Sequence, residues 1–354
     1  MKNSYKTSIN SKTKKETVNI PFMLSLKSSI SLIIAILCLI LLFYLAYRIW
    51  NILFYILFAM FIVGLAFQSF SKPVGKVLNK NSDSKIFEFV NNIANTMKIR
   101  NIDKIILAPD TNIGIIGIFE HDLLLGIAAM DFLSDEELYA ILFHEFAHFK
   151  SWDNILGSLL IRINISLKNI IAIISSITII GFIIGIFLAM FNALYTLIIL
   201  FYSRQREFLA DYAASSFVGG QKFGKALETY SKVSNEFNVK VNAVLNYYFS
   251  HKLALNNIYD TVRKSEVNFD EQTKNKMNEA IRKSNEHTHL LSTHPALNKR
   301  INNISKINGK LKEFPKQVGN CKNLFSNFEL YEEELTRIIY NSLSIKLKEN
   351  KTQI

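Results

Sequence analysis

The chain has 354 residues, enough for two average soluble domains or for one domain together with membrane segments. Its mean hydropathy is +0.17 and its apolar residues are grouped into long runs, which excludes a wholly soluble protein. Only two cysteines are present, Cys38 and Cys321, which excludes a disulfide-rich scaffold and a cysteine-ligated metal cluster. The net charge of +12 would suit nucleic-acid binding, but the chain has no aromatic-basic RNA motif, so we expect no nucleic-acid partner.

Two uncharged runs near the N-terminus predict a pair of membrane helices. Residues 28–47 and 49–71 contain no charged side chain, and only Arg48 separates them. A spanning helix needs roughly 20 apolar residues, so the two runs predict a transmembrane hairpin. A third uncharged run covers residues 169–203. As one helix it would be about 52 Å long, far more than a bilayer core, so we expect a second hairpin that turns between Gly181 and Asn192.

Lysine placement predicts the orientation of these segments in the membrane. Residues 1–27 hold six lysines and one glutamate, and residues 72–85 hold four lysines and one aspartate. By the positive-inside rule both segments face the cytosol, and Arg204 and Arg206, which follow the third run, do so as well. We therefore expect a multi-pass protein of the cell membrane with a cytosolic N-terminus. Residues 1–22 are polar and rich in Lys, Ser and Asn, which predicts a disordered basic tail.

Mixed helix and strand patterns lie between the two hydrophobic regions. Residues 84–98 have the apolar spacing of an amphipathic helix. Three short β-like segments follow, at 104–108, 113–119 and 123–128. Ser134 and the three acidic residues after it are typical of a helix N-terminus, and that helix should continue to about Lys150. Residues 204–350 are mostly helical in pattern.

A metal-binding pattern lies within the helix that Ser134 begins. His144-Glu145-Phe146-Ala147-His148 has the form H-E-x-x-H. Histidines four residues apart lie on one face of a helix, so both imidazoles can bind a single zinc ion. Glu145, next to the first histidine, can act on a zinc-bound water as general base. Helix histidines on a polar face without a metal are the alternative interpretation of these residues.

A zinc hydrolase needs a third protein ligand, and the sequence offers acidic candidates for it. The extended pattern with a third histidine fails, because Ser151 and Asn154 stand where it requires Gly and His. Asp153 is too close to the motif on the same helix to reach the metal easily. Glu207 follows the second predicted hairpin directly and so returns to the same side of the membrane. Asp211, one turn further on, could accept a hydrogen bond from a ligating imidazole.

The chain resembles the HtpX and CAAX-prenyl-protease family of integral-membrane zinc metallopeptidases over about residues 25–305. The matching pieces, in family order, are Leu133-Ser134-Asp135-Glu136-Glu137-Leu138 leading into the H-E-x-x-H motif, then Asp153, Ser203-Arg204-Gln205-Arg206-Glu207-Phe208-Leu209-Ala210-Asp211, Thr293-His294-Pro295 and Arg300. Two hydrophobic hairpins, one before the motif and one after it, resemble the HtpX branch. At the substrate-binding edge strand the family often has Asn-Ala-Phe-Ala, whereas this chain has Asn112-Ile113-Gly114-Ile115.

The resemblance implies a role for each of these residues and one zinc ion per chain. The ligands would be His144, His148 and Glu207, the base Glu145, the supporting residues Asp211, Asp153 and Arg300, and the residue that helps to hold substrate or the developing oxyanion His294. The implied fold is mainly α, a multi-pass membrane protein with about four transmembrane helices and a cytosolic zincin-type α+β catalytic domain that contains a small β-sheet. The implied partners are the lipid bilayer and polypeptide substrates, chiefly membrane proteins.

We therefore predict a gluzincin-like zinc metalloendopeptidase that acts in quality control of membrane proteins on the cytosolic side. Its predicted segments are a tail (1–22), a hairpin (23–71), the first catalytic part (72–154), a second hairpin (155–203), the second catalytic part (204–305) and a helical extension (306–354). Two alternatives stay open. One is a dedicated maturation protease for a single peptide or lipoprotein, and the other is an inactive zinc-binding membrane scaffold, although a structural site would not need Glu145.

Overall fold

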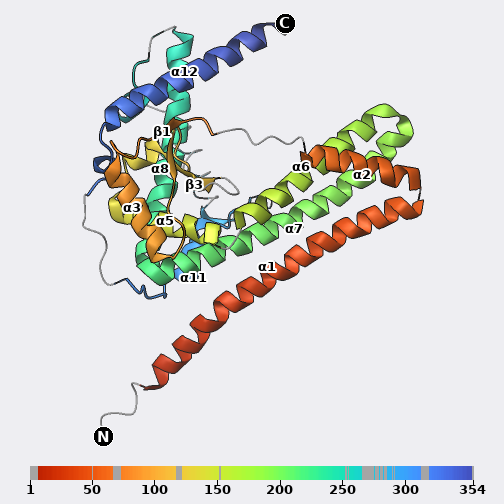
Figure 1. Ribbon diagram of the computed structural model, residues 1–354, viewed down its shortest axis with the longest axis horizontal. Coiled ribbons are helices and arrows are strands. Elements are labelled where there is room, and N and C mark those ends of the chain that lie inside the picture. The colour runs from red at the N-terminus through yellow and green to blue at the C-terminus, as the bar shows by residue number, and fades with distance from the viewer. Residues whose placement is uncertain are drawn as a thin grey trace. The chain divides into compact units, whose positions relative to one another are not determined.

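The computed structural model describes the chain except for a set of short segments. These are residues 1–6, 50, 67–72, 117–121, 151–152, 252, 254, 265–274, 276–278, 280–281, 283–284, 289, 291, 312–318 and 353–354. The chain divides into two compact units. The hairpin unit comprises Met1–Ser71, Trp152–Tyr212 and His287–Ala296, and the sheet unit comprises Lys72–Ser151, Ala213–Glu286 and Leu297–Ile354. Helices dominate both units (Figure 1).

Long apolar helices form the hairpin unit. They are α1 (Thr7–Ile49), α2 (Asn51–Ala66), α6 (Asp153–Ile177) and α7 (Ile179–Val218), whose last turns belong to the sheet unit. Three segments of the described chain are long and apolar enough to cross a membrane: Pro21–Arg48, Ile155–Ile177 and Ile179–Val218. The 16 residues of α2 would extend only about 24 Å, less than a bilayer core of roughly 30 Å. Three of the four predicted spans are therefore supported by length and composition.

The α6–α7 turn lies earlier than the sequence indicates. It is at Thr178, where the two helices are interrupted and the Thr178 hydroxyl accepts a hydrogen bond from the Gly181 amide at 2.9 Å. The predicted turn between Gly181 and Asn192 is wrong, because Gly181 is a packing residue and not a turn residue. A Cβ atom there would overlap the carbonyl oxygen of Ile174, and one at Gly185 would overlap the Ser175 hydroxyl.

The N-terminal end of α1 also differs from the sequence prediction. Helix α1 begins at Thr7, inside the segment for which composition predicts disorder. A run of lysines and a glutamate favours helix once the apolar part that follows has nucleated it, which accounts for the difference. Residues 1–6 of the predicted tail lie outside the described residues.

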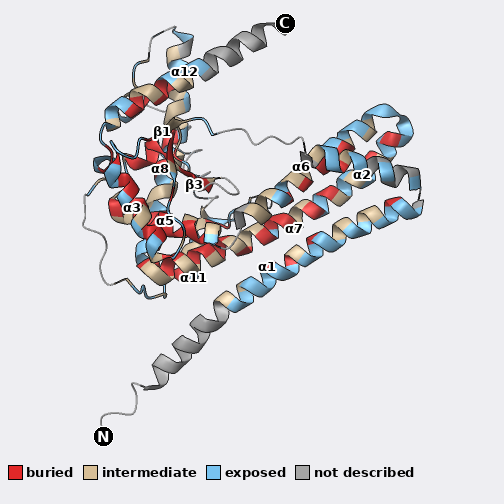
Figure 2. Cartoon of the chain, in the orientation of Figure 1, coloured by how far each residue is buried: buried red, intermediate tan, exposed pale blue. Residues whose placement is uncertain are grey.

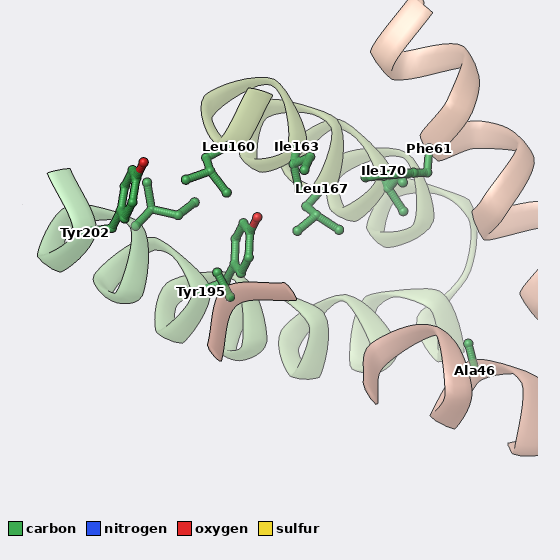
Figure 3. Close-up of a cluster of buried hydrophobic side chains, with 10 residues drawn as sticks. Ala46, Phe61, Leu160, Ile163, Leu167, Ile170, Tyr195 and Tyr202 are labelled. Carbon is green, nitrogen blue, oxygen red and sulfur yellow. The ribbon is translucent and has the colours of Figure 1, made fainter. Parts of the chain in front are cut away.

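The core of the hairpin unit is apolar and lies between its helices. Leu160, Ile163, Leu167 and Ile170 of α6 pack with Tyr195, Ile199 and Tyr202 of α7 and with residues of α1 and α2. The Tyr195 ring extends from α7 toward Leu167 (Figure 3). Most of the described α1 surface is exposed (Figure 2).

A four-stranded sheet organises the sheet unit. Its strands are β1 (Lys76–Val77), β2 (Lys104–Ala108), β3 (Ile113–Ile116) and β4 (Asp122–Gly126), in the order β1-β2-β4-β3. β2 and β4 are parallel and the other pairs are antiparallel. Because β3 stands last in the strand order, it is an edge strand. The three predicted strands are confirmed where they are described, and residues 117–119 lie outside the described residues. The last strand ends at Gly126, because the next four residues form a short helix, α4 (Ile127–Met130).

Helices pack around this sheet. They are α3 (Ser84–Thr96), α5 (Asp135–Lys150), α8 (Gly220–Ser250), α9 (Ile258–Lys264), α11 (Leu297–Ile304) and α12 (Phe328–Thr352). The Ser134 hydroxyl accepts a hydrogen bond from the Glu137 amide, and the Glu137 carboxylate accepts one from the Ser134 amide. This reciprocal capping box confirms the helix start predicted from the sequence. The amphipathic helix predicted after residue 83 is confirmed as α3.

The C-terminal segment holds the start of α5. The Asp135 amide donates to the Gly319 carbonyl and the Cys321 amide donates to the Leu133 carbonyl, each at 3.1 Å. Further along, the Arg263 guanidinium pairs with the buried Glu332 carboxylate at 2.6 Å. The predicted helical extension is thus part of the sheet unit and fixes the N-terminus of the helix that carries the H-E-x-x-H motif.

Candidate functional site

Helix α5 brings two imidazoles together. His144 and His148 are one turn apart, and their Nε2 atoms lie 3.1 Å from each other. Two nitrogens bound to one tetrahedral zinc at about 2.05 Å would be separated by about 3.3 Å. The observed spacing therefore fits a shared metal ion. The His144 side chain is buried, whereas His148 is half-buried.

Aromatic packing fixes the first histidine. The His144 ring stacks on Phe223 of α8 with a centroid distance of 5.7 Å, and Phe143 stacks on Phe217 of α7 at 4.8 Å. Arg300 of α11 places its Nη2 atom 3.4 Å from Nε2 of His144. Helices α8 and α11 thus hold the histidine face of α5 within the sheet unit.

Glu145 points toward the edge strand of the sheet. A Cβ atom built on Gly114 of β3 would lie 3.6 Å from Oε2 of Glu145. Nearby, the Tyr230 hydroxyl of α8 donates to the Thr111 carbonyl at 3.0 Å. Burial and the charge of Glu145 raise the pKa of Tyr230, so this phenol stays protonated as a hydrogen-bond donor. The carboxylate of the predicted base therefore lies beside β3, the edge strand of the sheet.

Glu207 lies on α7 and is buried. Its Oε2 atom is 3.0 Å from Nδ1 of His294, whose side chain is 62% exposed. The resemblance assigns His294 to substrate or to the developing oxyanion, and the contact seen in the structure is with the carboxylate of the predicted third ligand. The role of His294 toward substrate stays a prediction.

The three predicted ligands form one group. One ligand atom each from His144, His148 and Glu207 lies within 4.8 Å of the others, so the donor set of two imidazoles and a carboxylate fits a catalytic zinc site. Asp211 is fully buried, and its predicted hydrogen bond to an imidazole stays a prediction. Asp153 is the first residue of α6, and its side chain lies outside the described residues.

Sequence reasoning missed several residues around the site. Phe223 and Tyr230 come from one face of α8, whose helical pattern carries no catalytic motif. Their contacts join positions about 80 or more residues apart in the chain, so no local spacing could have shown them. Gly114 had a signal, because glycine inside a strand often marks a close approach of another chain.

A family comparison decides the relationship. A family model described as Peptidase family M48 matches residues 114–308, more than half of the chain. The chain belongs to peptidase family M48. The match spans the edge strand, the H-E-x-x-H motif, Glu207 and Arg300, so the metallopeptidase family and the candidate metal site agree. Searches of curated proteins and of solved structures found no match to this M48 member.

Proposed function

We propose that this M48 member is a membrane-embedded zinc endopeptidase that cleaves membrane or membrane-associated proteins on the cytosolic side. The observation that carries the proposal is the convergence of His144, His148 and Glu207, with Glu145 adjacent to the first histidine. A structural zinc site is normally closed by four protein ligands, whereas three ligands leave a position open for chemistry. The group found in the described residues has three.

The three side chains would hold one zinc ion per chain. A zinc ion bound there supplies Lewis-acid chemistry, which polarises a carbonyl group and makes water more acidic. Glu145 takes the proton from the attacking water and passes it to the leaving amine, as a general base that becomes a general acid. Arg300, with Nη2 3.4 Å from Nε2 of His144, adds positive charge near the reacting carbonyl. It would not hydrogen bond to this nitrogen when zinc is bound, because the metal would take the lone pair. His294 orients the Glu207 carboxylate.

A polypeptide substrate would bind by adding a strand to the edge of the sheet. β3 pairs only with β4 among the described strands, and Gly114 of β3 faces the Glu145 carboxylate. Main-chain hydrogen bonds to an edge strand bind extended segments of many sequences, as proteolysis of unfolded or damaged proteins requires. This supports a quality-control role over the maturation of one dedicated substrate.

The membrane arrangement belongs to the proposal as well. The three apolar helices support a membrane protein, and the fourth span predicted from the sequence, of which α2 is the described part, belongs to this proposal, as in the HtpX branch. Lysine placement supports a cytosolic N-terminus and a cytosolic active site in the cell membrane. If the chain crosses the bilayer an even number of times between His144 and Glu207, both residues reach the same side of the membrane.

Casein digestion by detergent-purified protein tests this function. We expect wild-type protein to cleave unfolded casein at several sites, and a zinc chelator to stop cleavage. Glu145→Gln should keep its zinc, because the ligands remain, yet lose about 10²–10⁴-fold of the activity. A zinc-loaded Glu145→Gln that cleaves at the wild-type rate would show that the mechanism is wrong. Cleavage of one protein in membranes and of none in casein would favour the maturation protease, and a zinc-loaded, inactive wild type would favour the scaffold.

A further inference from the structure

We propose that Gly114 determines the specificity of cleavage and selects substrates with an aromatic side chain at the position that pairs with it. This inference rests on the proposed peptidase function and adds a substrate class to it. Gly114 has no side chain, and it lies on the strand next to the catalytic base Glu145. The residues around Gly114 indicate which substrate side chain can occupy the space that this leaves.

The space above Gly114 is bounded by an apolar side chain and a carboxylate. Gly114 pairs with Leu124 of β4, which is half-buried and lies on the same face of the sheet. In the direction of the absent side chain, a Cβ atom would meet Oε2 of Glu145 at 3.6 Å and no other neighbour within 4 Å among the described residues. Any side chain longer than alanine at position 114 would therefore enter the space beside Glu145.

The strand cannot move to close this space, because its start is fixed. Gly126 has no side chain where a Cβ atom would overlap the backbone of Thr111, so β4 and the loop before β3 are in close contact. The Tyr230 hydroxyl donates to the Thr111 carbonyl at 3.0 Å, and the Thr111 and Ser234 hydroxyls are hydrogen bonded at 2.8 Å. The position of Gly114 beside Glu145 is thus held by contacts at the start of β3.

An aromatic side chain suits this opening better than any other type. A substrate strand added to β3 places one side chain directly opposite Gly114, on the same face of the sheet. An aromatic ring in that position covers the exposed glycine backbone and packs against Leu124, as cross-strand aromatic residues do over edge glycines. The positive edge of the ring is also compatible with the Glu145 carboxylate. Acidic side chains would be repelled by that carboxylate.

The test is an enzyme–substrate double-mutant cycle. Cleavage sites are first mapped by mass spectrometry after digestion of unfolded β-casein by wild-type protein. Synthetic peptides then carry one mapped site with Phe, Leu, Ala or Glu at the enriched position. The enzymes are wild type, Gly114→Ala, Gly114→Val and Gly157→Ala, where Gly157 of α6 has no described residue within 4 Å of its Cβ position. Zinc content and the thermal midpoint of each variant show that it is folded.

We expect wild-type protein and Gly157→Ala to prefer Phe over Ala by about tenfold in kcat/KM, the size typical of a well-filled apolar subsite. Gly114→Val should reduce the preference to less than about twofold, with Gly114→Ala in between, while peptides with Ala are still cleaved. An unchanged preference in both Gly114 variants would overturn this inference and leave the peptidase function intact. If Gly114→Val does not fold, Gly114→Ala alone decides. No zinc-dependent cleavage by wild type would instead overturn the proposed function.

Discussion

The hairpin unit exposes aliphatic side chains of the types that the sheet unit buries. In the hairpin unit Ile179 and Ile180 are 84% and 71% exposed, whereas in the sheet unit Ile105 and Leu123 are fully buried. Exposed aliphatic side chains in such numbers are not compatible with water around them, but they suit a hydrocarbon solvent. The difference teaches that one chain is folded for two solvents, and that each unit depends on different interactions.

Polar groups show the same contrast. Along the apolar parts of α6 and α7, the hairpin unit keeps a small neutral pair, in which the Asn164 amide donates to the Thr196 hydroxyl at 3.0 Å. Its buried carboxylates, Glu207 and Asp211, lie beyond these parts, toward the C-terminal end of α7. The sheet unit holds an ion-pair network, because Arg263 bridges Glu332 at 2.6 Å and Asp131 at 2.8 Å. Lipid cannot solvate an unsatisfied charge, so neutral contacts and close helix packing must hold the apolar parts of these helices together.

Labelling in intact cells gives the largest effect expected from this comparison. In a Cys38→Ser, Cys321→Ser background, single cysteines at the exposed positions Lys80 and Lys225 should resist an impermeant thiol reagent until the membrane is opened. A cysteine at Arg48, an exposed position in the last turn of α1, should react from outside. Labelling of position 225 from outside would contradict a cytosolic active site. Ser215 is unsuitable for this purpose, because its side chain is buried.

Removing one buried charge should destabilise the sheet unit strongly. Hydrogen bonds with Glu332 raise the pKa of Arg263, so its guanidinium is charged, and Glu332→Ala leaves that charge with Asp131 and the more distant Asp260. We expect a loss of about 3 kcal/mol in unfolding free energy, at the low end for a broken buried pair. Thermal unfolding in detergent measures it. Asp260→Asn, a change in a half-buried carboxylate 3.7 Å from the same arginine, should shift the midpoint much less. Equal midpoints for the two variants would show that the buried pair contributes nothing.

Adding one methyl group should have a smaller effect on the hairpin unit. Gly181→Ala places a Cβ atom against the Ile174 carbonyl, whereas Gly157→Ala on the neighbouring helix meets none of the described residues within 4 Å. We expect Gly181→Ala to cost about 1–3 kcal/mol by overpacking, and Gly157→Ala to be neutral or slightly stabilising. Resistance to unfolding in detergent compares the two variants. If both behave like wild type, close packing at the Thr178 turn is not what holds the hairpin.

Local patterns in the sequence were enough to predict α3, α5 with its Ser134 cap, and the strands at the centre of the sheet. They failed at Gly181, because a glycine can mark either a turn or a close contact between helices. Gly181 is required for helix contact and not for a turn. The ligand group was predictable because the motif fixes two members by helix spacing. Other contacts join parts of the chain that are distant in sequence, and no periodicity in the sequence indicates them. Examples are the hydrogen bond from the Asp135 amide to the Gly319 carbonyl and the one from the Tyr230 hydroxyl to the Thr111 carbonyl before β3.

Zinc content tests the central claim most directly. After dialysis against a weak chelator, wild-type protein should retain about one zinc per chain. Glu207→Ala should lose nearly all of it, whereas Glu228→Ala, which changes an exposed carboxylate of α8, should retain it, and Asp153→Ala should weaken binding less than Glu207→Ala does. Full zinc retention in Glu207→Ala together with loss in Asp153→Ala would contradict the assignment of the third ligand and, with it, the metal site on which the proposed chemistry depends.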